Sequence, residues 1–230
     1  MSQTANPSRT VPTRRLALEP TFEAVPHPIE AGEDLILSHL VAALSSVFPD
    51  GEDFFVRSVR QFRDQVTDPA LKRQVAGFIG QEAMHGREHR AFNTHLDSTG
   101  YHTKLAERIT RKSIAFQERH LSAASNLAAT AALEHFTATI AELVLSSPET
   151  QDLFGHEAVR NLFLWHALEE SEHNAVAFDV YKAVGGSERL RVFTMRLIRA
   201  AFVVGIALTT AISLATDRGT YRPGSLRASS

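Results

Sequence analysis

The chain has 230 residues, enough for one sizeable hydrophobic core, and no change of composition within residues 30–190 suggests a second domain. The net charge is −2, with 24 basic and 26 acidic residues scattered along the sequence, which disfavours a nucleic-acid partner. No cysteine is present, which excludes disulfides, iron–sulfur clusters and thiolate zinc sites.

The N-terminal part of the chain changes character near residue 30. Residues 1–29 are rich in Pro, Thr, Ser and Arg and lack the apolar core of a signal peptide, so we expect a flexible arm of a cytoplasmic protein. Apolar residues then recur at helical spacing from about residue 31 to 48. We expect Pro49-Asp50-Gly51 to end this helix and a second helix to start at Glu52 and stop at Thr67-Asp68-Pro69.

A long third helix is predicted up to about Ser98, where Gly100 follows as a breaker. One face of it carries Glu82, His85 and His89 among apolar residues. Residues 102–120 also have helical periodicity but are more polar. A link with its own helix fits the crossover that joins the two halves of a ferritin-like bundle.

Two further helices carry charged residues in apolar stripes. The first, about residues 121–145, holds Glu134 among residues that are mostly small, where we expect a substrate or oxygen pocket: Leu127, Thr130, Ala131, Ala138 and Ala141. The second, about residues 157–184, places His166, Glu170 and His173 within a narrow arc and is closed by Gly185-Gly186.

The last predicted helix, about residues 188–216, contains sixteen uncharged residues at 200–215. These span about 24 Å, which is short of the ~30 Å hydrocarbon core of a bilayer. Two interpretations stay open, a helix that packs on the bundle or forms a subunit interface, and a peripheral membrane contact through residues 197–216. Residues 217–230 are expected to form a flexible tail.

The charged residues of these stripes follow a recognisable order, Glu52, Glu82-x-x-His85, Glu134 and Glu170-x-x-His173, which is the ligand pattern of a ferritin-like di-metal bundle. Unpaired charges inside a core cost several kcal/mol each. Four glutamates carry four negative charges, which two divalent ions neutralise, whereas one zinc ion would leave two. Carboxylate-rich ligation with some imidazole suits iron, with manganese as the alternative.

Several of these residues have simpler explanations when taken singly. Glu52 could cap a helix N-terminus, and a lone buried histidine such as His39 is usually a hydrogen-bonded core residue. Glu169 is rotated by about 100° from the ligand face, so it is a less certain ligand than its neighbour. His85-x-x-x-His89 has zinc spacing, with Glu82 as base or ligand, but the His-Glu-x-x-His order of zinc proteases is absent.

The chain resembles a bacterial family known as predicted metal-dependent hydrolases, whose members look ferritin-like. The resemblance covers about residues 30–195 and rests on Phe-Pro-Asp-Gly-Glu-Asp-Phe-Phe at 48–55, Gln-Glu-Ala-Met-His at 81–85, Glu-His-Phe-Thr-Ala at 134–138 and Trp-His-Ala-Leu-Glu-Glu-Ser-Glu-His at 165–173. The His-x-x-x-Glu-x-x-His part is similar to a helix of the di-iron arylamine N-oxygenases. That similarity implies His166 as a seventh ligand, with His89 as the other candidate.

The sequence therefore predicts an all-α, ferritin-like four-helix bundle at residues 30–186, with additional N- and C-terminal helices. We expect a non-haem di-iron oxidoreductase that uses O2 on a small organic substrate and takes electrons from an external donor. A hydrolase and a ferroxidase or iron-binding protein are the alternatives, and a homodimer is left open. The expected catalytic and metal-binding residues are Glu52, Glu82, His85, Glu134, His166, Glu170 and His173, with His89 and Glu169 as further candidates.

Overall fold

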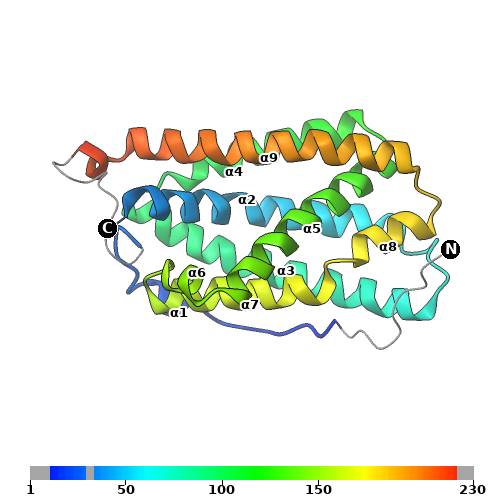
Figure 1. The fold of residues 1–230 in the computed structure, drawn as a ribbon, viewed down its shortest axis with the longest axis horizontal. Helices are drawn as coiled ribbons and strands as arrows, with labels where there is room; N and C mark the ends of the chain where they lie inside the picture. Colours follow the sequence, from blue (N-terminus) through cyan, green and yellow to red (C-terminus); the bar gives the residue numbers. More distant parts are fainter. Residues whose placement is uncertain (1–10, 30–33, 222–230) are drawn as a thin grey trace.

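The computed structural model describes residues 11–29 and 34–221, and these form an elongated bundle of helices without any strand (Figure 1). The predicted all-α bundle is confirmed. Four long helices build its interior: α2 (Leu35–Arg60), α3 (Pro69–Thr99), α5 (Ala123–Ser146) and α7 (Glu157–His173). The helix α2 packs on α3, and α5 packs on α7.

Two more helices cover one side of this bundle. The predicted crossover is α4 (Thr103–His120), and the apolar C-terminal helix is α9 (Glu188–Thr216); both pack on α2, and α9 also packs on α5 (Figure 1). The remaining elements are short: α1 (Glu19–Phe22), α6 (Pro148–Asp152), α8 (Val176–Ala183) and the 3₁₀ turn η2 (Arg218–Tyr221).

The helix break expected at Pro49-Asp50-Gly51 is wrong, because α2 continues through these residues. A proline inside a helix leaves the carbonyl four residues earlier without its N–H donor. Here that carbonyl belongs to Ser45, and Asn93 Nδ2 of α3 donates to it at 3.1 Å instead. Glu52 consequently lies in the middle of α2 and does not cap a helix N-terminus.

The helix expected at residues 157–184 is divided in two, since α7 ends at His173 and α8 begins at Val176. Asn174 lies at the break, and its short amide side chain favours turns over helix interiors. The predicted stops are confirmed at Gly100 and Gly185, which have φ angles of 112° and 76°.

The N-terminal segment differs from the expected flexible arm over residues 11–29, because Phe22, Val25 and Ile29 are buried in the core. Figure 1 shows its first part running along the outside of α3 and α7. A Cβ atom on Gly77 of α3 would lie 2.1 Å from the Val11 carbonyl oxygen, so the missing side chain permits this close approach. Residues 1–10 and 222–230 of the expected arm and tail lie outside the described residues.

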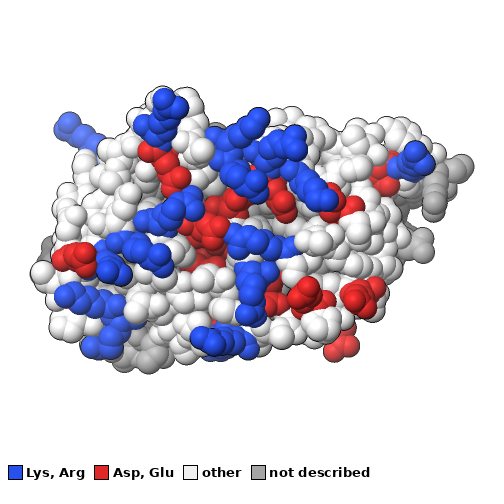
Figure 2. All heavy atoms as spheres, turned by 180° about the vertical axis from the view of Figure 1, so that it is seen from behind, with Lys and Arg blue, Asp and Glu red and all other residues white. Residues whose placement is uncertain are grey.

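The outer surface differs between the back of the molecule and the outward face of α9. Behind the view of Figure 1, basic and acidic side chains lie intermingled (Figure 2), and exposed ion pairs such as Arg57 with Glu118 and Arg111 with Asp50 join α4 to α2. The outward face of α9 is apolar instead, with exposed Phe193, Leu197, Val203, Val204, Leu208 and Ile212. Within the described residues, α9 is the one helix long and apolar enough to span a membrane.

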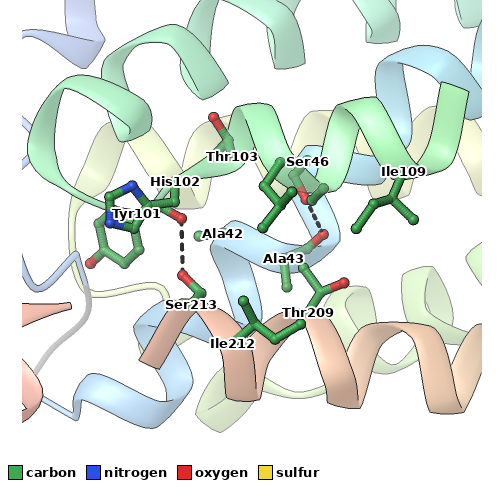
Figure 3. Close-up of a pocket in the computed structure, with 12 residues that line it drawn as sticks. Ala42, Ala43, Ser46, Tyr101, His102, Thr103, Ile109, Thr209, Ile212 and Ser213 are labelled. Atoms are coloured by element: carbon green, nitrogen blue, oxygen red, sulfur yellow. Dashed lines mark hydrogen bonds between the residues drawn. The ribbon is translucent and has the colours of Figure 1, made fainter. Parts of the chain in front are cut away.

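The inner face of α9 is anchored at its C-terminal end. Ser213 Oγ lies 2.9 Å from the carbonyl oxygen of Tyr101, next to a small cavity of about 30 Å³ between α2, α4 and α9 (Figure 3). This contact fixes α9 against the connection between α3 and α4.

Candidate metal centre

The seven expected ligands come from four helices and meet in one interior region. Each of their side chains belongs to a residue that is at most 5% exposed. Glu52 lies on α2, Glu82 and His85 on α3, Glu134 on α5, and His166, Glu170 and His173 on α7. The structure thus brings all seven together, while their binding of a metal stays a prediction.

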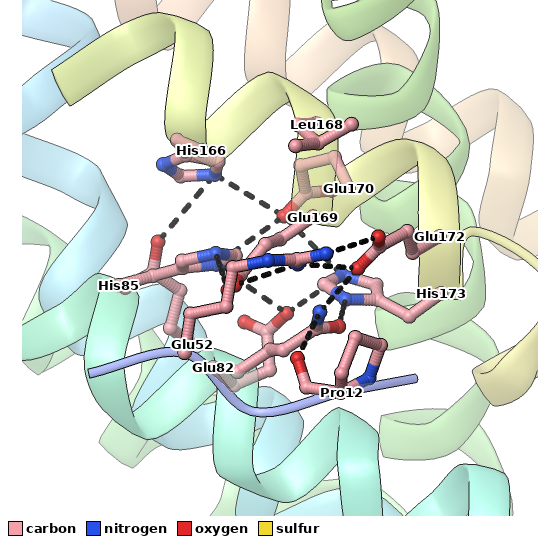
Figure 4. A network of polar contacts seen from close by, with 12 residues as sticks. Pro12, Glu52, Glu82, His85, His166, Leu168, Glu169, Glu170, Glu172 and His173 are labelled. Carbon is pink, nitrogen blue, oxygen red and sulfur yellow. Dashed lines mark hydrogen bonds and ion pairs between the residues drawn. The ribbon is translucent and has the colours of Figure 1, made fainter. Parts of the chain in front are cut away.

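Glu170 occupies the middle of the site. Its Oε1 atom lies 3.1 Å from His166 Nε2, 3.4 Å from His173 Nε2 and 3.7 Å from His85 Nδ1 (Figure 4). Glu134 reaches the same region from α5, with Oε2 3.5 Å from His173 Nε2. The donor atoms form two sets, and the atoms within each set lie within 4.8 Å of one another. One set comes from Glu52, His85 and His166, and the other from Glu82, Glu170 and His173.

Most of the inward-facing atoms have no hydrogen-bond partner. These buried atoms are both carboxylate oxygens of Glu52, Glu82 and Glu134, one oxygen of Glu170, Nδ1 of His85 and Nε2 of His173. An unpaired buried polar group costs about 1–3 kcal/mol, and a charged one costs more. Oxygen-rich donors with imidazole nitrogen are the ligands of divalent iron, manganese or zinc. The donor set therefore fits metal ions at this position.

The outward nitrogens of the ligand histidines are held by neighbours. His85 Nε2 donates to Glu169 Oε2 at 3.1 Å, and His173 Nδ1 donates to Gln81 Oε1 at 2.8 Å. Each bond leaves the lone pair of the other ring nitrogen directed at the centre. Glu169 is thereby one hydrogen bond from the centre, and Gln81 has a role that no sequence spacing indicated.

A chain of hydrogen bonds fixes the third imidazole. Ser45 Oγ donates to Asn93 Oδ1 at 2.6 Å, so it must accept from His89 Nδ1 at 2.8 Å. The neutral His89 ring then accepts at Nε2 from His166 Nδ1, also at 2.8 Å. His166 Nε2 is left with its lone pair toward Glu52 and Glu170. Both nitrogens of His89 are used, which places it behind His166 instead of in the centre.

An arginine from the N-terminal segment closes the site from outside. Arg14 Nη1 donates to Glu169 Oε1 at 3.0 Å, and Arg14 Nη2 donates to Glu172 Oε1 at 2.6 Å. Gln81 Nε2 donates to Glu172 as well, at 2.7 Å. The role of Arg14 is not predictable from the sequence, because the position of an arginine in a segment without periodicity carries no signal.

In the protein without bound cations, several buried carboxyl groups lie close together, and this changes their pKa values. Burial raises the pKa of Glu52, Glu82 and Glu134 well above the ordinary value, and the charges of neighbouring glutamates raise each of them further. Burial lowers the pKa of His85 well below its ordinary value. Burial also acts to raise the pKa of Glu170, but His173 and His166, in the protonated form that has an inward N–H when no cation is bound, hold it well below the usual range.

A cavity of about 310 Å³ opens beside the centre, between α2, α4, α5 and α9, and Glu52, His166 and Glu170 line its inner end. The pocket expected along the face of Glu134 is found only in part. Ala141 lines a second cavity of about 60 Å³ that also reaches His166 and Glu170, whereas Leu127 and Thr130 are fully buried. Small residues there let α5 pack closely on α2, with Thr130 Oγ1 2.6 Å from Ser58 Oγ.

A second group of histidine and carboxylate side chains lies at the far end of the bundle. His27 Nε2 and His39 Nε2 lie 2.9 and 3.1 Å from the same oxygen of Asp217. His39 Nδ1 is 2.7 Å from Ser213 Oγ, and Asp217 Oδ1 accepts from the Gly219 N–H at 2.8 Å. His39 is thus the hydrogen-bonded core histidine that the sequence suggested.

A helical bundle that gathers four carboxylates and three imidazoles, with unpaired donor atoms turned inward, defines a metal-binding bundle protein. Within that class, the chain belongs to the predicted metal-dependent hydrolase family, whose model matches residues 18–229. The match includes α9 and part of the N-terminal segment, which lie outside the range of the sequence resemblance. Neither the curated proteins nor the solved structures contain a match.

Proposed function

We propose that this protein is a non-haem di-iron oxidoreductase that uses O2 to oxidise a small organic substrate. The observation that carries the proposal is the set of four buried glutamates with unpaired oxygens next to a largely apolar cavity. Two divalent ions would balance four carboxylate charges, whereas a single ion would leave two charges uncompensated in the core. Carboxylate-rich ligation favours iron, with manganese as the alternative.

The two sides of the centre suggest which residues would hold each ion. Glu52, His85 and His166 would hold one, and Glu82, Glu134 and His173 the other, with Glu170 between them. A bound iron pair would supply the electrons that reduce O2, and an external donor would restore them. The protein itself keeps the three imidazoles in one tautomer through Glu169, Gln81 and His89.

The surroundings of the centre support oxidation of an organic molecule. Phe48 lies against His166, Phe78 against His173 and Trp165 against His85, with ring centroids 4.8–5.0 Å apart. These rings limit movement of the imidazoles and make the surroundings of the centre apolar. The adjoining apolar cavity would position a substrate carbon or nitrogen close to the metals, and a bound apolar substrate would displace water from the centre.

Hydrolysis is the second candidate, and the description of the family favours it. A hydrolase would use the same ligands to lower the pKa of a bound water. It would need that water to reach the substrate, and it would work with zinc or manganese and without O2.

The two candidates are separated by loading metal-free protein with Fe(II) under argon and then admitting O2. We expect two irons per chain and O2 consumption, measured with an oxygen electrode, and a large loss of both in Glu134→Ala. Glu142→Gln is the matched control, because Glu142 is exposed on the same helix. Ester hydrolysis by the zinc- or manganese-loaded protein, with no O2 consumption by the iron-loaded protein, would overturn the proposal in favour of a hydrolase.

A further inference from the structure

We propose that the cavity between α2, α4, α5 and α9 is the substrate site and that it takes an uncharged, largely apolar molecule that enters between α4 and α9. That the bound molecule is a substrate rests on the proposed function, whereas its binding in the cavity can be tested separately. It names the substrate class, which the ligand pattern alone leaves open.

The position and size of the cavity indicate that a small molecule can bind beside the metals. It runs from Glu52, His166 and Glu170 at the centre to the inner side of α9, where Phe202 and Ile206 form its wall. Its volume of about 310 Å³ lies at the lower end of the range for small-molecule sites, ~300–1,000 Å³. A molecule bound there would have one end beside the metals and the other beneath α9.

The charges of the residues that line the cavity indicate that the bound molecule is uncharged. No Lys or Arg is among the described residues that line the cavity, and its carboxylates, Glu52 and Glu170, are at the inner end. A carboxylate or phosphate group would therefore lose its hydration without gaining a cationic partner. Thr110, Ser113 and Gln117 of α4 can offer a few hydrogen bonds along one side, so one neutral polar group is compatible with the lining.

The mouth of the cavity indicates where an apolar molecule would enter. Ile109 of α4 lines the cavity yet is 51% exposed, and Ser113 beside it is exposed as well, so the cavity reaches the surface at this helix. Leu105 and Phe116 of α4 add exposed apolar area on this side, and the outward face of α9 is apolar too. An apolar molecule would gain contacts with both helices before entry, whereas an ion would not.

Two glycines give a way to fill the cavity without disturbing its walls. Gly51 and Gly205 both line it, and a Cβ atom added to either would meet no other atom within 4 Å. Leu at position 51 would occupy the space next to the centre, and Phe at position 205 would occupy the space near α9. Val204, the neighbour of Gly205, is 56% exposed and does not line the cavity, so Val204→Phe is a matched control.

The test uses the fluorescent probe N-phenyl-1-naphthylamine, which is neutral, and 8-anilinonaphthalene-1-sulfonate, which has the same rings with a sulfonate added. We expect saturable binding of the neutral probe by the metal-loaded protein and at least tenfold weaker binding in Gly51→Leu and in Gly205→Phe. Val204→Phe should bind like the unmodified protein. The sulfonate should displace the neutral probe at least tenfold less effectively than a neutral competitor, 1-naphthol.

Iron content and circular dichroism are measured for every variant, so that a misfolded variant is recognised and replaced by the other. Absence of saturable binding would overturn the inference, as would unchanged binding in both correctly folded glycine variants or equal displacement by the sulfonate. Probe binding that is lost in the glycine variants of a protein that holds no iron would uphold the cavity as a binding site while overturning the di-iron function.

Discussion

The two groups of histidine and carboxylate side chains in this bundle both combine imidazoles with carboxylates but differ in how their polar atoms are paired. At the centre, Glu52, Glu82 and Glu134 have no hydrogen-bond partner for either carboxylate oxygen. At the far end, Asp217 lies between two imidazoles and a backbone N–H, and His27 Nδ1 is the one unpaired atom among the three side chains. We infer that the first group requires cations, whereas the second is stable by itself.

The largest expected effect concerns Glu170, because this residue lies between both sets of donors. Glu170→Ala should reduce the bound iron from two ions per chain to nearly none. Ligand binding stabilises a fold by about 4 kcal/mol for each ion at a concentration 1,000 times its dissociation constant. The unmodified protein should therefore gain several kcal/mol of unfolding free energy on adding Fe(II) under argon, and the variant should gain almost none. An equal gain of unfolding free energy in both proteins would show that Glu170 is not a metal ligand.

The second prediction addresses the far end with Asp217→Asn. Both imidazoles contact the same carboxylate oxygen, Oδ2, and an amide oxygen in its place would be uncharged, while the amide NH2 group would face the Gly219 N–H. Hydrogen bonds to a charged group contribute about 1.5–3 kcal/mol each. We expect the free energy of unfolding to fall by about 2–3 kcal/mol, measured by urea denaturation. Iron content should stay at two ions per chain. Loss of an ion in this variant would mean that the far end is also a metal site.

The third prediction compares two histidines within the centre. Substitution of a residue that orients a metal ligand typically weakens metal binding by about 10- to 100-fold. His89→Ala should therefore weaken iron binding within this range, while His166→Ala should weaken it more, because it removes an inward nitrogen. Competition with a chromophoric chelator measures both. A larger effect in His89→Ala would contradict the hydrogen-bond chain from Asn93 to His166.

The smallest expected effect is the response of the far end to acid. Burial lowers the pKa of His39, although the Asp217 carboxylate opposes this, and His27 and His102 lower it further. The unfolded chain then takes up this proton at a higher pH than the folded chain, so stability falls as pH drops below about 6.5. The pKa of Asp217 is lowered, which adds a further loss only below its unfolded value, about 3.9.

Hydrogen exchange measures this response locally. Amides near His39 and Ser213 should exchange faster at pH 5.5 than at pH 7.5, after correction for intrinsic rates, in the unmodified protein. In His39→Phe, which has no titrating ring, the difference should shrink. An equal pH response in both proteins would show that another group is responsible.

The sequence predicted which charged side chains gather in the interior better than it predicted the ends of the helices that carry them, for a physical reason. A carboxylate in an apolar stripe is costly, so its spacing indicates a site before any tertiary contact is known. The continuity of α2 through Pro49 depends on the side chain of Asn93 in another helix, which no local pattern encodes. The packing of residues 11–29 is likewise decided by tertiary contacts.

The position of the cavity and the hydrogen bonds to the outward atoms of the ligands could not be predicted from the sequence, for related reasons. Small residues on α5 can either leave space or permit close packing, and here they pack closely near Thr130. Gln81, Ser45 and Arg14 are polar residues of a kind that usually faces solvent. Only the positions of their partners, His173, His89 and Glu169, reveal what they do.

The number of iron ions bound at saturation tests the central claim most directly. Metal-free protein is saturated with Fe(II) under argon, passed through a desalting column and analysed by mass spectrometry of the metal together with quantitative amino-acid analysis. We predict two irons per chain in the unmodified protein and in Asp217→Asn, and fewer than one in Glu170→Ala. A single ion per chain, or two ions that persist in Glu170→Ala, would contradict the di-metal centre.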